Sequence, residues 1–156
     1  MRKILLILAI VVFGAGSAFA QMEKPTEKPA TETKQKSLYE RLGGYDALAA
    51  VSDDFIGRLG ASKILGRFVV GLSDDSKGKL RQHFVEFLCK ATGGSCVYMG
   101  RDMKTVHKGL GISEADWTES IKLLNETLDK FKVPKPERDE VLAAIQSLKA
   151  DVVEKK

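Results

Sequence analysis

After residue 37, apolar residues recur every three or four positions, which is the spacing of one face of an α-helix. This recurrence predicts helices over residues 45–59, 76–92 and 113–131, and a final helix that carries the apolar positions of 141–152. No segment between them alternates apolar and polar residues as a half-buried strand does. The pattern therefore predicts an all-α domain without internal repeats.

Capping signals support these boundaries. Ser37 and Ser113 each stand three positions before an acidic residue, which is the spacing of a capping box at a helix start. Glycine pairs at 43–44 and 93–94 end the elements that precede them. A further short element is predicted over residues 102–108, between the second glycine pair and the helix that begins at Ser113.

The N-terminal segment has a different pattern. A basic start at residues 1–3 precedes an unbroken apolar run over 4–13, and Ala18-Phe19-Ala20 has the small-x-small form of a cleavage site. We predict a signal peptide over residues 1–20, cleaved after Ala20, and export to a bacterial periplasm. The apolar run is shorter than the about 20 residues that span a membrane. The alternative is that residues 1–20 are not cleaved and anchor the protein in the membrane. We expect no other attachment to a membrane.

The rest of the chain divides into a tether and one domain. Residues 21–36 are rich in Pro, Thr, Glu and Lys and predict a solvated, disordered linker, which leaves residues 37–156 as one domain with one core. The formal net charge is +4, and removal of Arg2 and Lys3 leaves +2. Because lysines alternate with acidic residues and form no basic patch, we exclude nucleic acid as a partner. We expect a monomer.

Two cysteines, Cys89 and Cys96, lie seven positions apart on either side of the second glycine pair. In an oxidising compartment, a disulfide across this turn is plausible, and the chain-entropy estimate for so short a loop is about 2 to 2.5 kcal/mol. Two separate buried thiols, or a metal or redox role, are the alternatives. The spacing matches neither a C-x-x-C redox motif nor a C-x-x-C-H haem-attachment motif.

The chain has two histidines, His83 and His107, which stand 24 residues apart. His83 precedes Phe84 at the border of an apolar helix face, and His107 follows Met103 by four positions. Each histidine alone is typical of a structural residue next to the core. If the two histidines faced each other across a gap between two elements, they would fit a flat ligand with two axial positions. A zinc site is less suited to them, because zinc needs three or four ligands. No motif of a catalytic triad is present.

An ordered set of motifs surrounds these histidines. The chain reads "SLYERLGGYDALAAVSDDF", then "FVEFL", "GG", "YMGRDMKTVHKGLGI" and a tryptophan. In this order and spacing the motifs resemble the group I truncated haemoglobins, from Ser37 to about Val152. The resemblance implies a shortened globin fold, with two helices packed on two around a haem b that is bound non-covalently.

The resemblance also implies roles for individual residues. His107 would be the proximal ligand of the haem iron, with its second ring nitrogen fixed by a hydrogen bond. His83 stands where some members have a distal histidine that binds the iron when no gas is present. Two outcomes remain open, namely ligation of the iron by both histidines or a five-coordinate iron with His83 turned toward solvent.

The remaining implied haem contacts surround these two histidines. They comprise a proximal and edge group (Tyr98, Met103, Ile112 and Trp117), a distal group (Leu80, Phe84 and Leu88), a packing residue (Phe68) and a cation for a haem propionate (Arg81 or Lys79).

Three positions depart from the family pattern. Ile56 stands where many members have a tyrosine, Phe84 replaces a distal glutamine, and Phe68-Val69 replaces two phenylalanines. A hydrogen-bond donor that stabilises bound oxygen is worth roughly 1 to 3 kcal/mol, and an apolar pocket lacks it. We therefore expect fast oxygen dissociation and a relative preference for carbon monoxide.

The function implied by the resemblance is reversible binding of small gases (O2, CO and NO) or their transport, with an unidentified reductase as partner. The primary interpretation is non-enzymatic ligand binding, and NO dioxygenase, NO reductase or peroxidase-like side activity is left open. The alternative is a periplasmic haem redox protein that transfers electrons or removes NO or peroxide. A helical interaction module that has lost haem is a third hypothesis.

Overall fold

The computed structural model describes residues 35–155, so the predicted signal peptide and most of the predicted linker lie outside the described residues. No helix within 35–155 is long and apolar enough to cross a membrane. The helical elements are α1 (Leu38–Arg41), α2 (Gly44–Ala61), the 3₁₀ turn η1 (Gly66–Phe68), α3 (Asp74–Ala91), α4 (Met103–His107), α5 (Glu114–Lys130), α6 (Lys135–Gln146) and α7 (Lys149–Val152).

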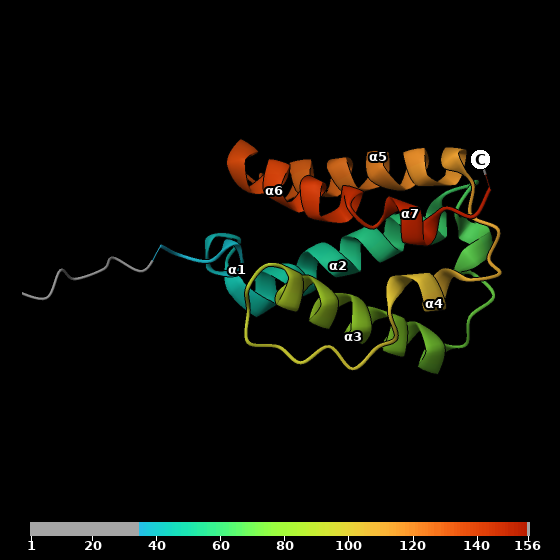
Figure 1. The fold of residues 1–156 in the computed structure, drawn as a ribbon, viewed down its shortest axis with the longest axis horizontal. Coiled ribbons are helices and arrows are strands. Elements are labelled where there is room, and N and C mark those ends of the chain that lie inside the picture. The colour runs from blue at the N-terminus through green and yellow to red at the C-terminus, as the bar shows by residue number, and fades with distance from the viewer. Residues whose placement is uncertain (1–34, 156) are drawn as a thin grey trace, which may run out of the picture. The chain divides into compact units, whose positions relative to one another are not determined.

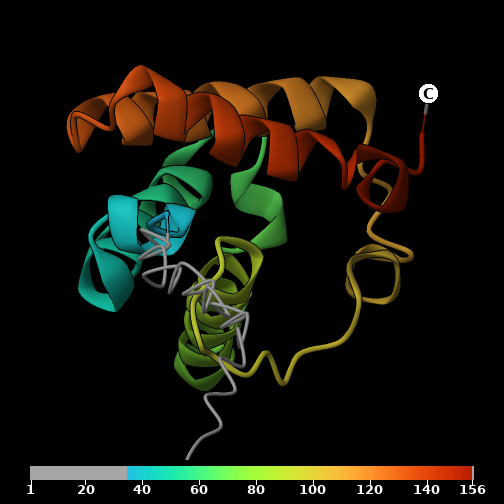
Figure 2. The ribbon, with the colours of Figure 1, turned by 60° about the vertical axis from the view of Figure 1, so that its left-hand side comes forward.

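The helices form two layers. Helix α2 packs against both α3 and α5, and α1 packs against α6. Figure 1 shows α5 and α6 side by side above α2 and α3, and the turned view of Figure 2 shows the same two layers. The only β-type pairing among residues 35–155 is an isolated bridge between Ser113 and Lys155. The predicted all-α, two-on-two architecture is confirmed.

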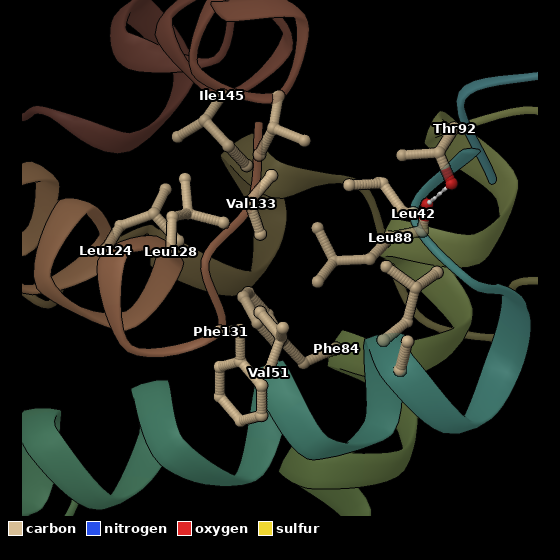
Figure 3. Close-up of a pocket in the computed structure, with 13 residues that line it drawn as sticks. Leu42, Val51, Phe84, Leu88, Thr92, Leu124, Leu128, Phe131, Val133 and Ile145 are labelled. Carbon is tan, nitrogen blue, oxygen red and sulfur yellow. Dashed lines mark hydrogen bonds between the residues drawn. The ribbon is translucent and has the colours of Figure 1, made fainter. Parts of the chain in front are cut away.

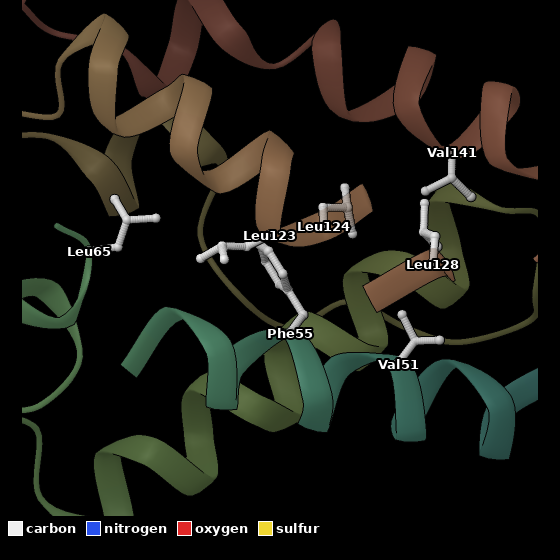
Figure 4. Packing of buried hydrophobic residues seen from close by; sticks show 7 residues of the cluster. All are labelled: Val51, Phe55, Leu65, Leu123, Leu124, Leu128 and Val141. Atoms are coloured by element: carbon white, nitrogen blue, oxygen red, sulfur yellow. The ribbon is translucent and has the colours of Figure 1, made fainter. Parts of the chain in front are cut away.

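The main hydrophobic core lies between these layers (Figure 4). Apolar side chains from α2 and α5 meet there, together with one from α6 and one from the turn that precedes η1. Full burial of a side chain of this size contributes about 1.5 to 3 kcal/mol, so this cluster holds the two layers together. Its buried members are Val51, Phe55, Leu65, Leu123, Leu124, Leu128 and Val141.

A polar contact also joins the two layers. The Asp54 carboxylate of α2 accepts hydrogen bonds from Arg58 (2.6 Å) and from the Thr127 hydroxyl of α5 (3.1 Å), and it also binds Lys130. Burial alone would raise the pKa of Asp54, but these donors outweigh it and hold the pKa at about 2. Asp54 therefore stays ionised and bound to α5 at neutral pH.

Both predicted capping boxes are confirmed. The Glu40 amide donates to Ser37 Oγ (3.2 Å), and the Glu40 carboxylate accepts the Ser37 amide (2.7 Å). At the start of α5, the Asp116 carboxylate accepts the Ser113 amide at 2.9 Å and completes the second box. These reciprocal bonds satisfy amides that have no partner inside the helix and so define where α1 and α5 begin.

The final helix departs from the prediction. Instead of one helix through residue 152, α6 ends at Gln146 and the short α7 follows. The Ser147 hydroxyl donates to the Ala144 carbonyl at 2.7 Å where the chain bends. The bend brings Leu148 and Val152 into a cluster separate from the main core. A straight helix would have continued along α5, away from α4.

Candidate functional site

Helix α4 presents His107 as its last residue. The helix begins after Asp102, whose carboxylate accepts the Thr105 amide at 2.9 Å and the Thr105 hydroxyl at 2.7 Å. These hydrogen bonds from Thr105 lower the pKa of Asp102 below its ordinary value. The carboxylate is therefore charged at neutral pH, which also suits the positive end of the helix dipole. This cap fixes the first turn of a helix of five residues.

The hydrogen bond of the His107 ring determines which nitrogen can bind a metal. Nδ1 lies 2.8 Å from the carbonyl oxygen of Met103, one turn earlier in α4. A carbonyl only accepts, so Nδ1 carries the proton and Nε2 of the neutral ring has the lone pair. Metal-bound histidines typically have this arrangement, because the bond to the carbonyl fixes both tautomer and ring orientation.

Four of the predicted haem-contact residues gather near α4. Phe68 of η1, Met103 of α4 and Trp117 of α5 pack with Ile112, which precedes α5. Ile112 and Trp117 are 8% and 7% exposed, and Val152 of α7 closes the cluster. An apolar surface beside a candidate iron ligand is what a haem ring requires, because most of such a ligand must leave water.

His83 is held much more loosely. Its side chain is 44% exposed on α3, and its Nδ1 lies 3.4 Å from a carboxylate oxygen of Glu86. That distance is at the outer limit of a hydrogen bond. The ring also makes an edge contact with Tyr98, with 6.1 Å between ring centroids. These two contacts define where the structure places the candidate distal ligand.

The structure places Tyr98 against α3. Its ring contacts both His83 and Phe87, the latter at 5.6 Å between centroids, and its hydroxyl donates to the Arg101 carbonyl at 2.7 Å. Tyr98 therefore lies beside His83, whereas Met103, Ile112 and Trp117 form the group near His107.

Glu86 anchors the loop that carries Tyr98. A hydrogen bond from Gln82 is the main reason that the pKa of Glu86 is lowered. Burial opposes this, and the Met99 amide and His83 add to it. Because the amide of Met99 donates to Glu86, the loop that precedes α4 is attached to the helix that carries His83.

A disulfide makes a second attachment of this loop. The sulfur atoms of Cys89 and Cys96 are 1.97 Å apart, with 5.8 Å between the Cα atoms. Cys89 lies near the end of α3 and is fully buried, while Cys96 is two residues before Tyr98. Neither sulfur is a thiol, and no group of three His, Cys, Asp or Glu side chains within residues 35–155 is arranged to hold a metal ion.

Two other predicted distal residues, Phe84 and Leu88, point from α3 toward the core. Phe84 stacks on Phe55 of α2 with 5.4 Å between centroids, Leu88 packs with Leu48, and Leu80 is half-buried one turn before Phe84. Phe84 and Leu88 also line an apolar cavity of about 120 Å³ between α2, α3, α5 and α6 (Figure 3). Sites for larger ligands measure about 300 to 1,000 Å³, so this cavity is too small for a haem.

The two candidate cations for a propionate are both paired with protein carboxylates. The Arg81 guanidinium binds both oxygens of Asp53 on α2, one of them at 2.8 Å, and this bond lowers the pKa of Asp53. Lys79 lies 2.8 Å from Asp75, one turn earlier in α3. Exposed pairs of this kind are worth about 0 to 1 kcal/mol, so either cation can exchange its partner for another anion.

A short helix that ends in a histidine with a free Nε2, an apolar cluster beside it and a second histidine on another helix are the features expected of a haem protein of the globin class. The match to a family of known proteins agrees with this geometry. The family model described as bacterial-like globin matches residues 37–154. The chain belongs to this family, and within it to the group 1 truncated haemoglobins.

Individual relatives give the same result. The group 1 truncated haemoglobin of Mycolicibacterium paratuberculosis is 34% identical over 116 residues, which cover 74% of this chain and 83% of the relative. The 2/2 haemoglobin of Synechococcus, solved in the cyanomet state with covalently attached haem, is similar at a TM-score of 0.68 and 29% identity, over 76% of this chain and 98% of that one. The truncated haemoglobin of Tetrahymena pyriformis shares the fold at a TM-score of 0.69 and 24% identity, over 76% and 98% of the two chains.

Some residues of the site were not predicted from the sequence. Phe55, which stacks on Phe84, was recognised only as part of a helix face. Glu86 and Asp53 were not singled out, because acidic residues on helix surfaces are common and their partners lie on other elements. The partners become visible only when α2, α3 and the loop before α4 are placed together.

Proposed function

We propose that this protein binds a haem through His107 and uses it to bind small diatomic gases reversibly. The observation that carries the proposal is the 2.8 Å hydrogen bond from His107 Nδ1 to the Met103 carbonyl. It makes Nε2 the ligating nitrogen and holds the ring in one orientation. The apolar cluster of Phe68, Met103 and Trp117 supports the proposal, because it provides a surface for the ring of the haem.

Non-covalent binding follows from the side chains that the chain offers. A thioether link to haem needs a cysteine, and both cysteines are used in the disulfide. His83 is the only histidine besides His107. Attachment through a histidine, in addition to iron ligation by both, would need a third one. The haem is therefore held by the His107 bond and by burial of its apolar ring.

His83 is the residue that would compete with a gas for the iron. When bound, haem would supply an iron that can bind O2, CO, NO or an imidazole. His83 is half-exposed and is held only by the 3.4 Å contact to Glu86 and the ring contact with Tyr98. Since both contacts are weak, His83 would be free to leave them as a ligand of the haem iron and to take them up again when a gas binds there.

The apolar distal residues determine how long oxygen stays. Ile56 is half-buried on α2, and Phe84 is fixed by its stacking on Phe55. Neither side chain can donate a hydrogen bond to a bound gas. We therefore propose faster release of oxygen than in globins with a distal donor, by about tenfold for each 1.4 kcal/mol of missing stabilisation.

The test uses visible spectra of the ferric and ferrous protein, with and without carbon monoxide. We compare three proteins after addition of haem, namely wild type, His83→Ala and the control Lys90→Ala. Lys90 is an exposed residue on the same helix as His83. A low-spin spectrum in wild type and Lys90→Ala that becomes high-spin in His83→Ala supports ligation by His83. The same high-spin spectrum in all three contradicts it, and the absence of a Soret band in wild type contradicts haem binding itself.

The same spectra distinguish gas binding from a redox function. If carbon monoxide displaces His83 from the ferrous iron within seconds, gas binding is supported, and a reductase partner would be needed to keep the iron ferrous. If His83 resists saturating carbon monoxide, the electron-transfer alternative is favoured. Size-exclusion chromatography of the haem-bound protein tests the expected monomer.

Export to the periplasm is part of the proposal. The disulfide between Cys89 and Cys96 supports it, because such bonds persist in oxidising compartments and are rare in the bacterial cytosol. Intact-mass measurement of the protein from a periplasmic extract should give a chain that starts at Gln21 and is two hydrogens lighter than the reduced chain. A chain that keeps Met1 and two free thiols would contradict export.

A further inference from the structure

The loop that follows His107 has an unusual backbone. Gly109 and Gly111 have φ values of +84° and +64°, in the left-handed region that glycine adopts readily. The Leu110 amide still donates to the His107 carbonyl at 3.1 Å, so the loop turns directly out of α4. In this turn the amides of the two glycines become available to a partner outside α4.

That partner is a single carboxylate at the C-terminus of the chain. Glu154 Oε1 accepts the Gly109 amide at 2.7 Å, and Glu154 Oε2 accepts the Gly111 amide at 2.6 Å. Both bonds are charge-assisted and short, and such bonds are about twice as strong as neutral ones. They lower the pKa of Glu154, so the carboxylate is ionised at neutral pH.

The backbone next to Glu154 holds the same loop. The amides of Glu154 and Lys155 both donate to the Ile112 carbonyl, at 2.9 and 3.0 Å, and the Glu114 amide donates to the Lys155 carbonyl at 3.2 Å. A side chain at position 111 would come within 3.1 Å of the Lys155 side chain. The positive φ explains why residue 111 is a glycine, since the end of the Lys155 side chain can move away.

Helix α4 depends on this C-terminal segment for its position. Its principal packing partner among the helices is α7, which ends two residues before Glu154 (Figure 2 shows α4 beneath α7). A helix of five residues cannot maintain itself, because helix nucleation is unfavourable and isolated helices of this length do not persist in water. Whatever fixes α4 therefore also fixes the direction of His107 Nε2.

From these contacts we infer that Glu154 is a positioning residue for the proximal histidine. Its carboxylate binds the two loop amides that follow His107 and so prevents α4 from tilting on α7. This inference rests on the proposed function in one respect, namely that His107 holds the haem iron. The clamp itself can be measured in the protein without haem.

The first measurement is hydrogen–deuterium exchange of the full chain without haem. We compare wild type, Glu154→Ala, Glu154→Gln and the control Glu126→Gln, which removes a carboxylate that pairs with Arg58 on α2 at 2.8 Å. Peptides that cover residues 108–113 should exchange about tenfold faster in Glu154→Ala, because two amides lose their acceptor. The control should exchange at the wild-type rate there. Unchanged exchange in Glu154→Ala would show that there is no clamp.

The second measurement reports on the iron–histidine bond. In a His83→Ala background, the resonance Raman iron–histidine band of the ferrous protein should broaden or shift in Glu154→Ala and Glu154→Gln. Haem loss to an excess of apomyoglobin should accelerate about tenfold. Glu154→Asp keeps the charge, so its Raman band and its rate of haem loss should lie between those of Glu154→Ala and wild type. The control Glu126→Gln should leave the band unchanged.

The outcomes separate the two hypotheses. Faster exchange with an unchanged Raman band and unchanged haem loss would overturn the positioning role, since the clamp would then be only structural. Wild-type protein that takes up no haem would overturn the proposed function, while the exchange experiment would still decide whether Glu154 holds the loop.

Discussion

The surroundings of the two histidines differ in how firmly they hold the imidazole ring. His107 makes a 2.8 Å hydrogen bond inside its own helix, and α4 is capped by Asp102 at one end and followed by a loop bound to Glu154. His83 has a 3.4 Å contact with Glu86 and an edge contact with Tyr98, and 44% of its side chain is exposed. One ring is fixed before any ligand arrives, and the other can move.

This difference fits the two tasks that we propose for the histidines at one iron. A permanent ligand benefits from a fixed tautomer and orientation, because no ordering remains to be done when the bond forms. A ligand that must give way to a gas needs a second stable position nearby, and the contacts with Glu86 and Tyr98 provide it. The stability of that position sets how strongly His83 competes.

Removal of each histidine should produce the largest contrast. We expect His107→Ala to lower haem affinity by more than about 100-fold, since even residues that only orient metal ligands are worth 10- to 100-fold. His83→Ala should lower it much less, because His107 and the apolar cluster remain. Titration of haem into each full-length protein, with helix content checked by circular dichroism, measures both. Equal losses would show that the two sides do not differ in this way.

The disulfide attaches the loop that precedes α4 to α3, the helix that carries His83, so its removal tests how much this attachment stabilises the fold. Cys89→Ser/Cys96→Ser should lower the free energy of unfolding by about 2 to 2.5 kcal/mol through loss of loop closure. Urea unfolding of the variant, of oxidised wild type and of reduced wild type measures this. Reduced wild type serves as the control for the buried serine at position 89. An unchanged unfolding midpoint after reduction would contradict the expectation.

Substitutions of Tyr98 test the contact that holds His83 and leave the surroundings of His107 unchanged. In Tyr98→Ala, His83 loses its ring contact, and we expect the equilibrium constant for binding of the iron by His83 to rise about two- to twelvefold, since an aromatic pair is worth about 0.5 to 1.5 kcal/mol. Tyr98→Phe keeps the ring, loses only the hydroxyl bond to Arg101 and should behave like wild type. Carbon monoxide binding kinetics report the competing fraction. Identical kinetics in all three proteins would show that Tyr98 does not hold His83.

The smallest expected effect is a pH dependence of the proximal side. The pKa of Glu154 is lowered because the amides of Gly109 and Gly111 donate to its ionised form. Its contribution to stability is therefore fully present above the unfolded-state pKa of about 4.5 and is lost as pH falls through the lowered folded value. The Tm of wild type should exceed that of Glu154→Gln at pH 7, and the difference should shrink below pH 4.5. A difference that grows on acidification would reverse the assigned sign.

Much of the fold was predictable from local patterns. The apolar spacing of Val51 and Phe55, and the capping boxes at Ser37 and Ser113, act within one or two turns of helix, so they can be recognised along the sequence. The break between α6 and α7 was not predicted. It depends on Leu148 and Val152 finding partners near α4, which is a contact between distant parts of the chain.

The same distinction between local patterns and contacts of distant residues applies to the candidate site. The helical class, the two histidines and their order within a recognisable set of motifs can be read from the sequence, because residue identity and local spacing carry this information. The folded structure was needed to show which His107 nitrogen can bind a metal, that Tyr98 lies against His83, and that Glu154 binds the loop after α4. Hydrogen bonds and ring contacts require atoms within a few ångströms, and residues 109 and 154 become neighbours only when the chain has folded.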